Sequence, residues 1–362
     1  MFGRETYRSL LPKDMNQPGI HLNHNMFGRE RIKSITTDDN GRERFFQMTE
    51  PAGEYQTMKQ LSVIIITYNR PDDLLALVRN LASQQRAADL LQEVIIINNA
   101  STADYSAVQA FIASTPGIPF RYHYSAENLG VARGRNLGIS MATAPILVTI
   151  DDDAAFRDNT ALQQIVAAFE SPFLRDNHTG ILCFKVLYAS TGQMQVNAFP
   201  HKQFEKYQHK ISFLAPYFIG CGHAILKAVY DKAGIYPVDF FYGMEEYDLT
   251  YRAIEQGYSI AYDASIVVLH NESPLGRTPH MTKMKMLWIN KSKVAYRYLP
   301  KPFFYSTAFM WSLEFLQKTA WNWKEWFSGW REIRRIPGKE SRTPLGAAAK
   351  TYLKRVEARL WY

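Results

Sequence analysis

Short apolar runs alternate with amphipathic segments between residues 61 and 150. The runs LSVIII at 61–66 and EVIII at 93–97 are rich in β-branched residues, which is typical of strands buried on both faces. Further strands are expected at 120–124 and 145–150, with helices at 71–84, at 103–114 and within 128–143. Strands that alternate with helices in this way predict a mostly parallel α/β sheet covered by helices.

The second half of the chain is less regular. Strands are expected at 180–187 and 217–226, followed by a helix at 244–257 that stops at Gly257. The apolar runs at 258–270 complete the predicted sheet and leave His270 at the end of a strand.

Polar clusters follow three of the first four predicted strands. They are Thr67-Tyr68-Asn69-Arg70, Asn98-Asn99-Ala100-Ser101 and Asp151-Asp152-Asp153. Because ligands of open α/β sheets bind beyond the carboxyl ends of the strands, we expect these clusters to converge on one site.

The three adjacent aspartates repel one another unless water or a cation offsets their charge. An aspartate run by itself is typical of a solvated turn. Its place directly behind a buried strand favours another interpretation, in which Asp151 and Asp153 hold Mg²⁺ or Mn²⁺ together with substrate phosphates. His270 could add a nitrogen ligand, although a lone histidine at a strand end is more often structural.

A second acidic cluster contains Glu245, Glu246 and Asp248. Acidic residues are favoured in the first turn of a helix, and Asp248 is spaced to pair with Arg252. The glutamates follow the aromatic and glycine-containing run DFFYGM, which could bury one carboxylate and raise its pKa towards that of a general base. We therefore assign Asp248 to helix stability and both glutamates to candidate catalysis.

The segment ENLGVARGRNLG at 127–138 contains three glycines that do not form the GxGxxG fingerprint of dinucleotide sites. Arg133 and Arg135 near the start of a helix could contact a diphosphate. Plain surface positions are the alternative for both arginines.

Taken in order, these segments resemble glycosyltransferase family 2 over about residues 61–270. The matching stretches are VIIITYNRP, VIIINNAST, ENLGVARGRNLG, VTIDDDA, FIGCGHAILKAVYDKAGIY, FYGMEEYDLTYRAIEQGY and VVLH, and the later INKSKVAYRYLP resembles rhamnosyltransferase-like bacterial members. The resemblance implies a GT-A fold with a mostly parallel, Rossmann-like sheet. It also implies an inverting, metal-dependent hexosyl- or deoxyhexosyltransferase that builds bacterial surface polysaccharide from a UDP- or dTDP-sugar and a glycan or lipid-linked acceptor.

The resemblance also assigns roles to individual residues. Asp151, Asp153 and His270 would hold Mg²⁺ or Mn²⁺, and Glu246, or else Glu245, would be the catalytic base. The nucleotide-sugar would contact Thr67, Asn69, Arg70, Asn98, Asn128, Arg135, Asn136 and Asp152.

Two of these positions depart from the family pattern, which usually has aspartate at both. Asn98 loses a charge, yet an amide can still bond to a pyrimidine ring. Glu246 lengthens the base by one methylene group. A sugar nucleotidyltransferase is the rival enzyme, but its glycine-rich loop after the first strand is absent. A membrane-associated scaffold with a degenerate transferase domain is the rival without activity, and the intact Asp151/Asp153 pair argues against it.

Composition bounds the location and the domain organisation. Two cysteines give no disulfide framework, and neither a secretory signal nor an apolar run of roughly 18 to 20 residues is present. We therefore expect a cytoplasmic protein, peripheral on the inner face of the membrane if the tail binds lipid. Residues 1–60 are interpreted as a partly ordered extension with MFGRE at 1–5 and 26–30, residues 61–275 as the catalytic domain and residues 276–362 as a helical, basic, Trp-rich region.

The C-terminal region carries its own charge pattern. Residues 290–362 contain 15 Lys and Arg against 5 Glu, on a chain whose total net charge is +8. Apolar side chains recur at helical spacing at Trp323, Trp326, Phe327, Trp330 and Ile333. Such a stripe either packs on the catalytic domain or lies in a lipid headgroup layer. Membrane attachment is slightly favoured, and no nucleic-acid partner is expected because no known module is present.

Overall fold

The computed structural model describes residues 34–37, 43–46, 59–276 and 278–360. The chain divides into two units, residues 1–57 and 58–362. In the first, β1 (Ser34–Thr37) pairs antiparallel with β2 (Glu43–Phe46). The repeated MFGRE of the N-terminal extension lies outside the described residues.

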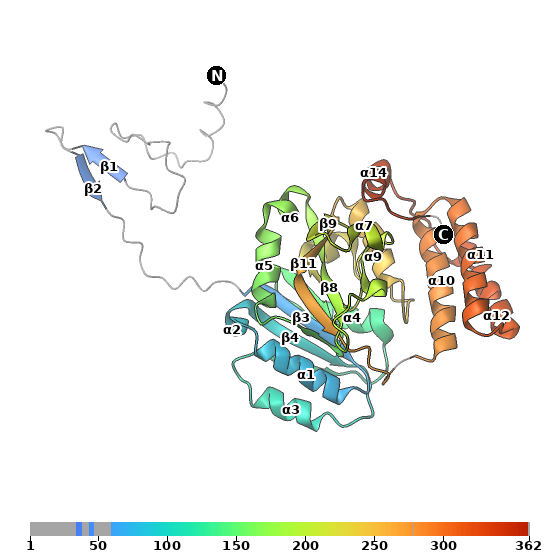
Figure 1. The fold of residues 1–362 in the computed structure, drawn as a ribbon, viewed down its shortest axis with the longest axis horizontal. Helices are drawn as coiled ribbons and strands as arrows, with labels where there is room; N and C mark the ends of the chain where they lie inside the picture. The colour runs from blue at the N-terminus through green and yellow to red at the C-terminus, as the bar shows by residue number, and fades with distance from the viewer. Residues whose placement is uncertain (1–33, 38–42, 47–58, 277, 361–362) are drawn as a thin grey trace, which may run out of the picture. The chain divides into compact units, whose positions relative to one another are not determined.

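A nine-stranded sheet forms the centre of the second unit (Figure 1). Its strands are β3 (Leu61–Thr67), β4 (Leu91–Asn98), β5 (Phe120–Tyr124), β6 (Ile146–Ile150), β7 (Ala154–Phe156), β8 (Thr179–Tyr188), β9 (Ser212–Leu214), β10 (Gly222–Leu226) and β11 (Ser259–His270). The order across the sheet is β5-β4-β3-β6-β10-β8-β11-β7, and β9 pairs with β11. Strands β7, β9 and β10 run opposite to the other six. The sheet is therefore mostly parallel, as the sequence predicts.

Helices cover both faces of this sheet. They are α1 (Pro71–Ala82), α2 (Ala87–Leu90), α3 (Ser106–Ala113), α4 (Gly130–Met141), α5 (Ala161–Glu170), α6 (Pro172–Asp176), α7 (Phe204–Tyr207), α8 (Lys227–Ala233) and α9 (Glu245–Glu255), with a 3₁₀ turn at Val196–Ala198. Along β3, Val63 and Ile65 share a core cluster with the Leu74 face of α1, whereas Ile64 packs with Ala132 and others on the opposite face. The expectation of strands buried on both faces is confirmed.

One predicted strand is shorter than expected. The run 217–226 becomes strand only from Gly222, because residues 217–221 leave the sheet and line a cavity instead. Helices α5 and α8 have no counterpart among the sequence-predicted elements, although both bury apolar side chains against the sheet.

The C-terminal helices pack on one another and on the sheet unit. They are α10 (His280–Tyr298), α11 (Lys301–Lys318), α12 (Trp323–Ile333), α13 (Ile336–Lys339) and α14 (Ala347–Arg355), and the first three lie side by side (Figure 1). Trp288 of α10 is fully buried in a cluster with Phe315 and Ile333. Val294 of α10 and Leu353 of α14 belong to the core under the sheet. Within the described part of the chain, no helix has the length and apolarity that a membrane crossing needs.

Candidate active site

The carboxyl ends of β3, β6 and β11 open onto a cavity of about 980 Å³. Nine of the sequence-predicted site residues line it: Arg70, Asn128, Arg135, Asp151, Asp152, Asp153, Glu245, Glu246 and His270. They come from segments up to 200 residues apart in the chain, so the topology of the sheet brings them together.

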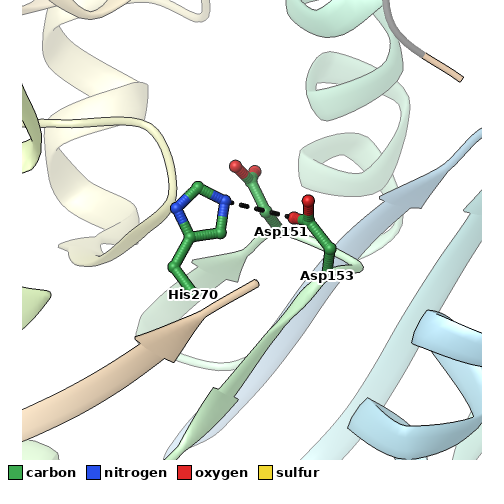
Figure 2. Close-up of side chains that lie close together, drawn as sticks. All are labelled: Asp151, Asp153 and His270. Carbon is green, nitrogen blue, oxygen red and sulfur yellow. Dashed lines mark ion pairs between the residues drawn. The ribbon is translucent and has the colours of Figure 1, made fainter. Parts of the chain in front are cut away.

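Asp151, Asp153 and His270 form a cluster whose ligand atoms all lie within 4.8 Å of one another (Figure 2). Both aspartates lie in the turn that joins β6 to β7. Strand β7 then pairs antiparallel with β11, and Ala154 lies opposite His270. This register places the imidazole beside the aspartates, with His270 Nε2 3.3 Å from Asp153 Oδ1.

Gln195 fixes the orientation of the imidazole. Its Nε2 donates to Glu272 Oε1 at 2.8 Å, so its Oε1 is the atom 2.9 Å from His270 Nδ1. An amide oxygen only accepts, so Nδ1 carries a proton and donates to it. The neutral imidazole therefore presents the lone pair of Nε2 to the aspartates, as a metal-binding histidine requires.

The cluster fits a divalent cation. Asp153 Oδ1 is buried and faces His270 Nε2 at 3.3 Å, a contact to which a protonated imidazole can donate. Burial alone would lower the pKa of His270, but its hydrogen bond to Asp153 and the Asp151 charge raise it above the usual value. Burial would raise the pKa of Asp153, yet His270 and Arg70 hold it below its ordinary range. Without a metal, a protonated His270 imidazole partly neutralises the two carboxylates. A bound divalent cation would neutralise them more fully.

Arg70 holds the rest of the aspartate turn. Its Nη1 lies 2.8 Å from Asp152 Oδ1 and 3.2 Å from Asp153 Oδ2, and its Nε donates to the Leu275 carbonyl at 2.7 Å. Burial raises the pKa of Asp152 to about 7, although the Arg70 charge opposes this shift. Arg70 therefore ties the turn to the segment that follows β11.

Arg135 connects the metal-ligand cluster to the acidic start of α9. Its Nη1 lies 2.8 Å from Glu246 Oε1 and 3.4 Å from Glu245 Oε1, and its Nη2 lies 3.5 Å from Asp151 Oδ1. The side chain is 5% exposed, and burial alone would lower its pKa, but the Glu246, Asp151 and Glu245 charges raise it above the usual value and keep the guanidinium charged. One buried cation thus sets the relative position of both candidate reactive centres.

The two glutamates differ in environment. The Glu245 side chain is 3% exposed and its Oε2 has no hydrogen-bond partner among the described residues, whereas the Glu246 side chain is 15% exposed. Burial and the neighbouring Glu246 charge raise the pKa of Glu245, and Arg135 opposes this only in part. Glu245 therefore favours the protonated form, which cannot accept a proton.

Residues 62–234 match the family model described as Glycosyl transferase family 2. The chain belongs to glycosyl transferase family 2. It is also 30% identical over 178 residues to an uncharacterized protein of Haemophilus influenzae, a stretch that covers 49% of this chain and 92% of that relative.

Three solved structures of glycosyltransferases share the GT-A fold of this family 2 chain. Mannosyltransferase PcManGT from Pyrobaculum calidifontis, in complex with GDP-Man and Mn²⁺, has a TM-score of 0.52 at 18% identity over 84% of this chain and 82% of that one. GalNAc-T7 with UDP, GalNAc and Mn²⁺ has a TM-score of 0.55 at 14% identity, over 83% and 57%. S. aureus TarS 1-349 in complex with UDP-GlcNAc has a TM-score of 0.50 at 15% identity, over 76% and 81%.

Four residues assigned to the nucleotide-sugar by the family 2 resemblance lie behind the cavity lining and bond to the protein. Thr67 Oγ1 lies 2.7 Å from Tyr105 Oη, Asn69 Oδ1 accepts from the Thr102 and Ala103 amides, Asn98 bonds to Ser101 and Tyr122, and Asn136 bonds twice to the Tyr236 backbone. Asn128 lines the cavity, and its oxygen accepts from Gly130 N and Asn99 Nδ2. Their roles towards a nucleotide stay predictions.

The pair between Asp248 and Arg252 is confirmed at 2.8 Å. Asp248 Oδ2 additionally accepts from Arg297 at 2.8 Å and from Tyr298 Oη at 2.9 Å, both on α10. Asp248 therefore anchors the C-terminal helices to α9, a role that helical spacing alone does not reveal.

Gly220 is a functional position that sequence reasoning misses. Its carbonyl accepts from Arg135 Nη2 at 3.0 Å, and a Cβ added at Gly220 would collide with Glu246 Oε1 and press on Arg135 Nη2. A single glycine in the loop before β10 gives no pattern, so only its contact with Arg135 and Glu246 identifies it.

Gly220→Ala is expected to displace the Glu246 carboxylate from Arg135 and to lower kcat by roughly tenfold or more, because small misplacements of reacting groups are costly. Steady-state transfer assays check this result. Gly117→Ala is the matched control, since a Cβ at that exposed turn glycine would meet open space. Equal turnover of Gly220→Ala and the wild-type chain would contradict the assignment.

Proposed function

We propose that this chain is an inverting, metal-dependent glycosyltransferase that moves a sugar from a nucleoside-diphosphate donor to a hydroxyl of a glycan or lipid-linked acceptor in bacterial surface polysaccharide synthesis. One observation carries the proposal. A ligand set for a divalent cation and an accessible carboxylate lie on the same cavity, and the buried Arg135 joins them. Family membership and the shared GT-A fold support it.

At the donor end, Asp151, Asp153 and His270 would hold Mn²⁺ or Mg²⁺. Two carboxylates and one imidazole suit Mn²⁺ particularly well. The bound cation would stabilise the negative charge that develops on the departing nucleoside diphosphate. Arg70 holds the aspartate turn through Asp152 Oδ1 and Asp153 Oδ2, whereas His270 faces Asp153 Oδ1.

At the acceptor end, Glu246 would take the proton of the attacking hydroxyl. Arg135 fixes its Oε1, and its partial exposure lets an acceptor reach the carboxylate. One displacement from the face opposite the leaving group inverts the anomeric centre. Glu245, which favours the protonated form, would support Glu246 rather than replace it.

Asn98 and Asn136 would act on the donor through other groups. Asn98 holds Ser101 and Tyr122, and Asn136 holds the backbone of Tyr236, over whose ring the Arg135 guanidinium lies at 5.7 Å. Both asparagines are therefore proposed as positioning residues.

Calorimetric titration of UDP, dTDP, GDP and ADP, each with Mn²⁺ and with EDTA, tests the proposal. We expect one nucleoside diphosphate to bind in the presence of Mn²⁺ and to lose most of its affinity in EDTA. The nucleoside diphosphate that binds identifies the nucleotide of the donor. Absence of binding for all four would favour a scaffold with a degenerate transferase domain.

The C-terminal helices are proposed to lie against an anionic membrane surface. Tyr305, Phe309 and Leu313 of α11 are 65%, 54% and 44% exposed, and Trp323 and Phe327 of α12 are 50% and 60% exposed. Lys324, Arg331 and Arg334 lie on α12 or at its end. Exposed aromatic residues flanked by cations are typical of helices in a headgroup layer.

Flotation with vesicles containing anionic lipid tests this attachment. Because Val294 and Leu353 belong to the shared core, truncation would unfold the protein, so we would use the double variant Trp323→Gln, Phe327→Gln. We expect it to lose most of its vesicle binding, whereas Val238→Gln, at a 65% exposed site elsewhere, should bind like the wild-type chain. Equal flotation of all three proteins would remove α12 from the membrane contact.

A further inference from the structure

Two stacked tyrosines line the same cavity as Glu246, and each has a lysine ammonium group near its ring. The rings of Tyr217 and Tyr247 lie 4.8 Å apart at 23°. Lys291 Nζ lies 4.2 Å from the centre of the Tyr247 ring, and Lys202 Nζ lies 5.8 Å from that of Tyr217. All four side chains line the cavity, as does Trp311, whose ring centre is 5.8 Å from Lys291 Nζ. We call this group the Lys291 cluster.

The lysines of the cluster differ from Lys285 and Lys293 of α10 in their partners. Lys285 pairs with Glu325 and Glu332, and Lys293 pairs with Asp239 and Glu340. Among the described residues, Lys291 and Lys202 make no ion pair within 4.0 Å of a carboxylate. The charges of described residues that lower the pKa of Lys291 are those of Lys202 and Arg359, which are both positive.

This arrangement is unfavourable for the protein alone. Burial lowers the pKa of Lys291 to about 7, and the Lys202 and Arg359 charges contribute to the shift. The like charges of Lys291 and Lys202 repel one another, and burial costs Lys291 part of its hydration. Faces of aromatic rings compensate a cation only partly, by about 0.5 to 2 kcal/mol. An anion that enters the cavity would remove the imbalance.

We propose that the Lys291 cluster is an acceptor subsite that binds an anionic group, a phosphate or a carboxylate, carried by the glycan. This inference rests on the proposed function and adds the chemical class of the acceptor. Lys291 and Lys202 bind the anionic group, and the aromatic rings that line the cavity contact the neighbouring sugar. Carbohydrate rings present apolar faces that suit such a platform.

The position of the cluster assigns it to the acceptor rather than to the donor. Tyr247 directly follows Glu246 in α9, so the cluster adjoins the proposed base. Asp151 and Asp153 lie between β6 and β7 and His270 ends β11, whereas Tyr247 lies on α9 and Lys291 on α10. The donor diphosphate would lie at the Asp151–Asp153–His270 cluster, and the acceptor would approach from the Lys291 side.

Calorimetry on the full chain with three small probes tests the subsite. Glycerol 3-phosphate presents a phosphate, glucuronate presents a carboxylate on a sugar, and glucose is the neutral control. Each probe is titrated into the wild-type chain, Lys291→Met, and Lys301→Met, a matched loss of one exposed lysine on α11. Methionine keeps the aliphatic stem of the lysine. The nucleoside diphosphate panel with Mn²⁺ is repeated on the same proteins.

We expect the wild-type chain and Lys301→Met to bind at least one anionic probe more tightly than glucose. The stronger of the two anionic probes distinguishes phosphate from carboxylate. Lys291→Met should weaken that binding by about tenfold or more, as for the loss of a hydrogen bond to a charged group, without changing nucleoside diphosphate binding. Equal binding by wild type and Lys291→Met, or no preference of the wild type for anionic probes, would overturn the inference.

Loss of nucleoside diphosphate binding in Lys291→Met would also overturn it, because the lysine would then belong to the donor site. The proposed function fails separately, if no nucleoside diphosphate binds the wild-type chain. Thermal unfolding provides the folding control. Since Lys291→Met removes like-charge repulsion, its Tm should equal or exceed that of the wild type. The difference in Tm should be largest below pH 7, where Lys291 is charged.

Discussion

Glu246→Gln is expected to lower kcat by a factor of roughly 10² to 10⁴, the usual contribution of a positioned general base. The amide can still accept from Arg135 Nη1, so the local packing is kept while the proton acceptor is lost. Steady-state transfer assays with the nucleotide-sugar chosen from the calorimetric panel give the result. Metal and nucleoside diphosphate affinities should stay close to wild type, because Glu246 does not belong to the ligand cluster.

Glu245→Gln is the matched control for this variant. Because burial and the Glu246 charge favour protonated Glu245, its replacement by a neutral amide of the same size should reduce kcat far less. A larger loss of kcat in Glu245→Gln than in Glu246→Gln would make Glu245 the general base and Glu246 the supporting residue. Similar losses in both would indicate that the two carboxyl groups share one proton and titrate as a pair.

The sheet and the metal-ligand cluster follow closely from local pattern. The alternation between Val63, Ile64 and Ile65 predicts a strand with two buried faces, and the structure buries each residue against a helix layer. A parallel sheet in turn requires the strand ends to meet, so the aspartates and His270 could be placed near one another without coordinates. The exact neighbour of His270 depends on the register of β7 with β11, which the pattern does not contain.

The groups that support the site are harder to predict. Gln195 orients His270, Gly220 leaves room for Glu246, and Arg135 joins the two centres. Gln195 and His270 are 75 positions apart in the chain and Arg135 and Glu246 are 111 apart, and none of these groups has a distinctive local spacing. Asn98 and Asn136 also make contacts that their motifs do not predict: their amides hold the backbone and neighbouring side chains, while their contact with a nucleotide stays a prediction.

The aromatic stripe of α12 was predicted either to pack on the protein or to face lipid, and the structure divides it. Trp326, Trp330 and Ile333 join the cluster around Trp288, and Gly329 allows the close approach because a Cβ there would meet the Trp288 ring. Trp323 and Phe327 are left exposed. Spacing of three and four residues predicts the helix face but cannot tell how far a neighbouring helix covers it.

Asp153→Ala is expected to weaken Mn²⁺ binding by more than the roughly 10- to 100-fold that loss of an outer-shell partner costs. The variant removes one of three proposed ligands and leaves Asp151 and His270. Since the nucleoside diphosphate is proposed to bind through the cation, its Mn²⁺-dependent affinity should fall in parallel. Calorimetric titration of Mn²⁺, alone and with the selected nucleotide, measures both. Gln195→Ala is a control with a smaller expected effect. It removes the hydrogen bond that orients the His270 imidazole but keeps all three proposed ligands.

The pH dependence separates a ligand role of His270 from a structural one. Asp153 and Asp151 raise the pKa of His270 in the metal-free protein, so a proton competes with the cation for Nε2. As the pH falls below that raised pKa, the Kd for Mn²⁺ should rise by about tenfold per pH unit. In Asp153→Ala the pKa of His270 loses its largest raising contribution, so this pH dependence should move to lower pH while the affinity at high pH stays weak. A wild-type affinity that is constant between pH 5 and pH 8 would exclude His270 from the ligand set and leave the two aspartates as its protein ligands.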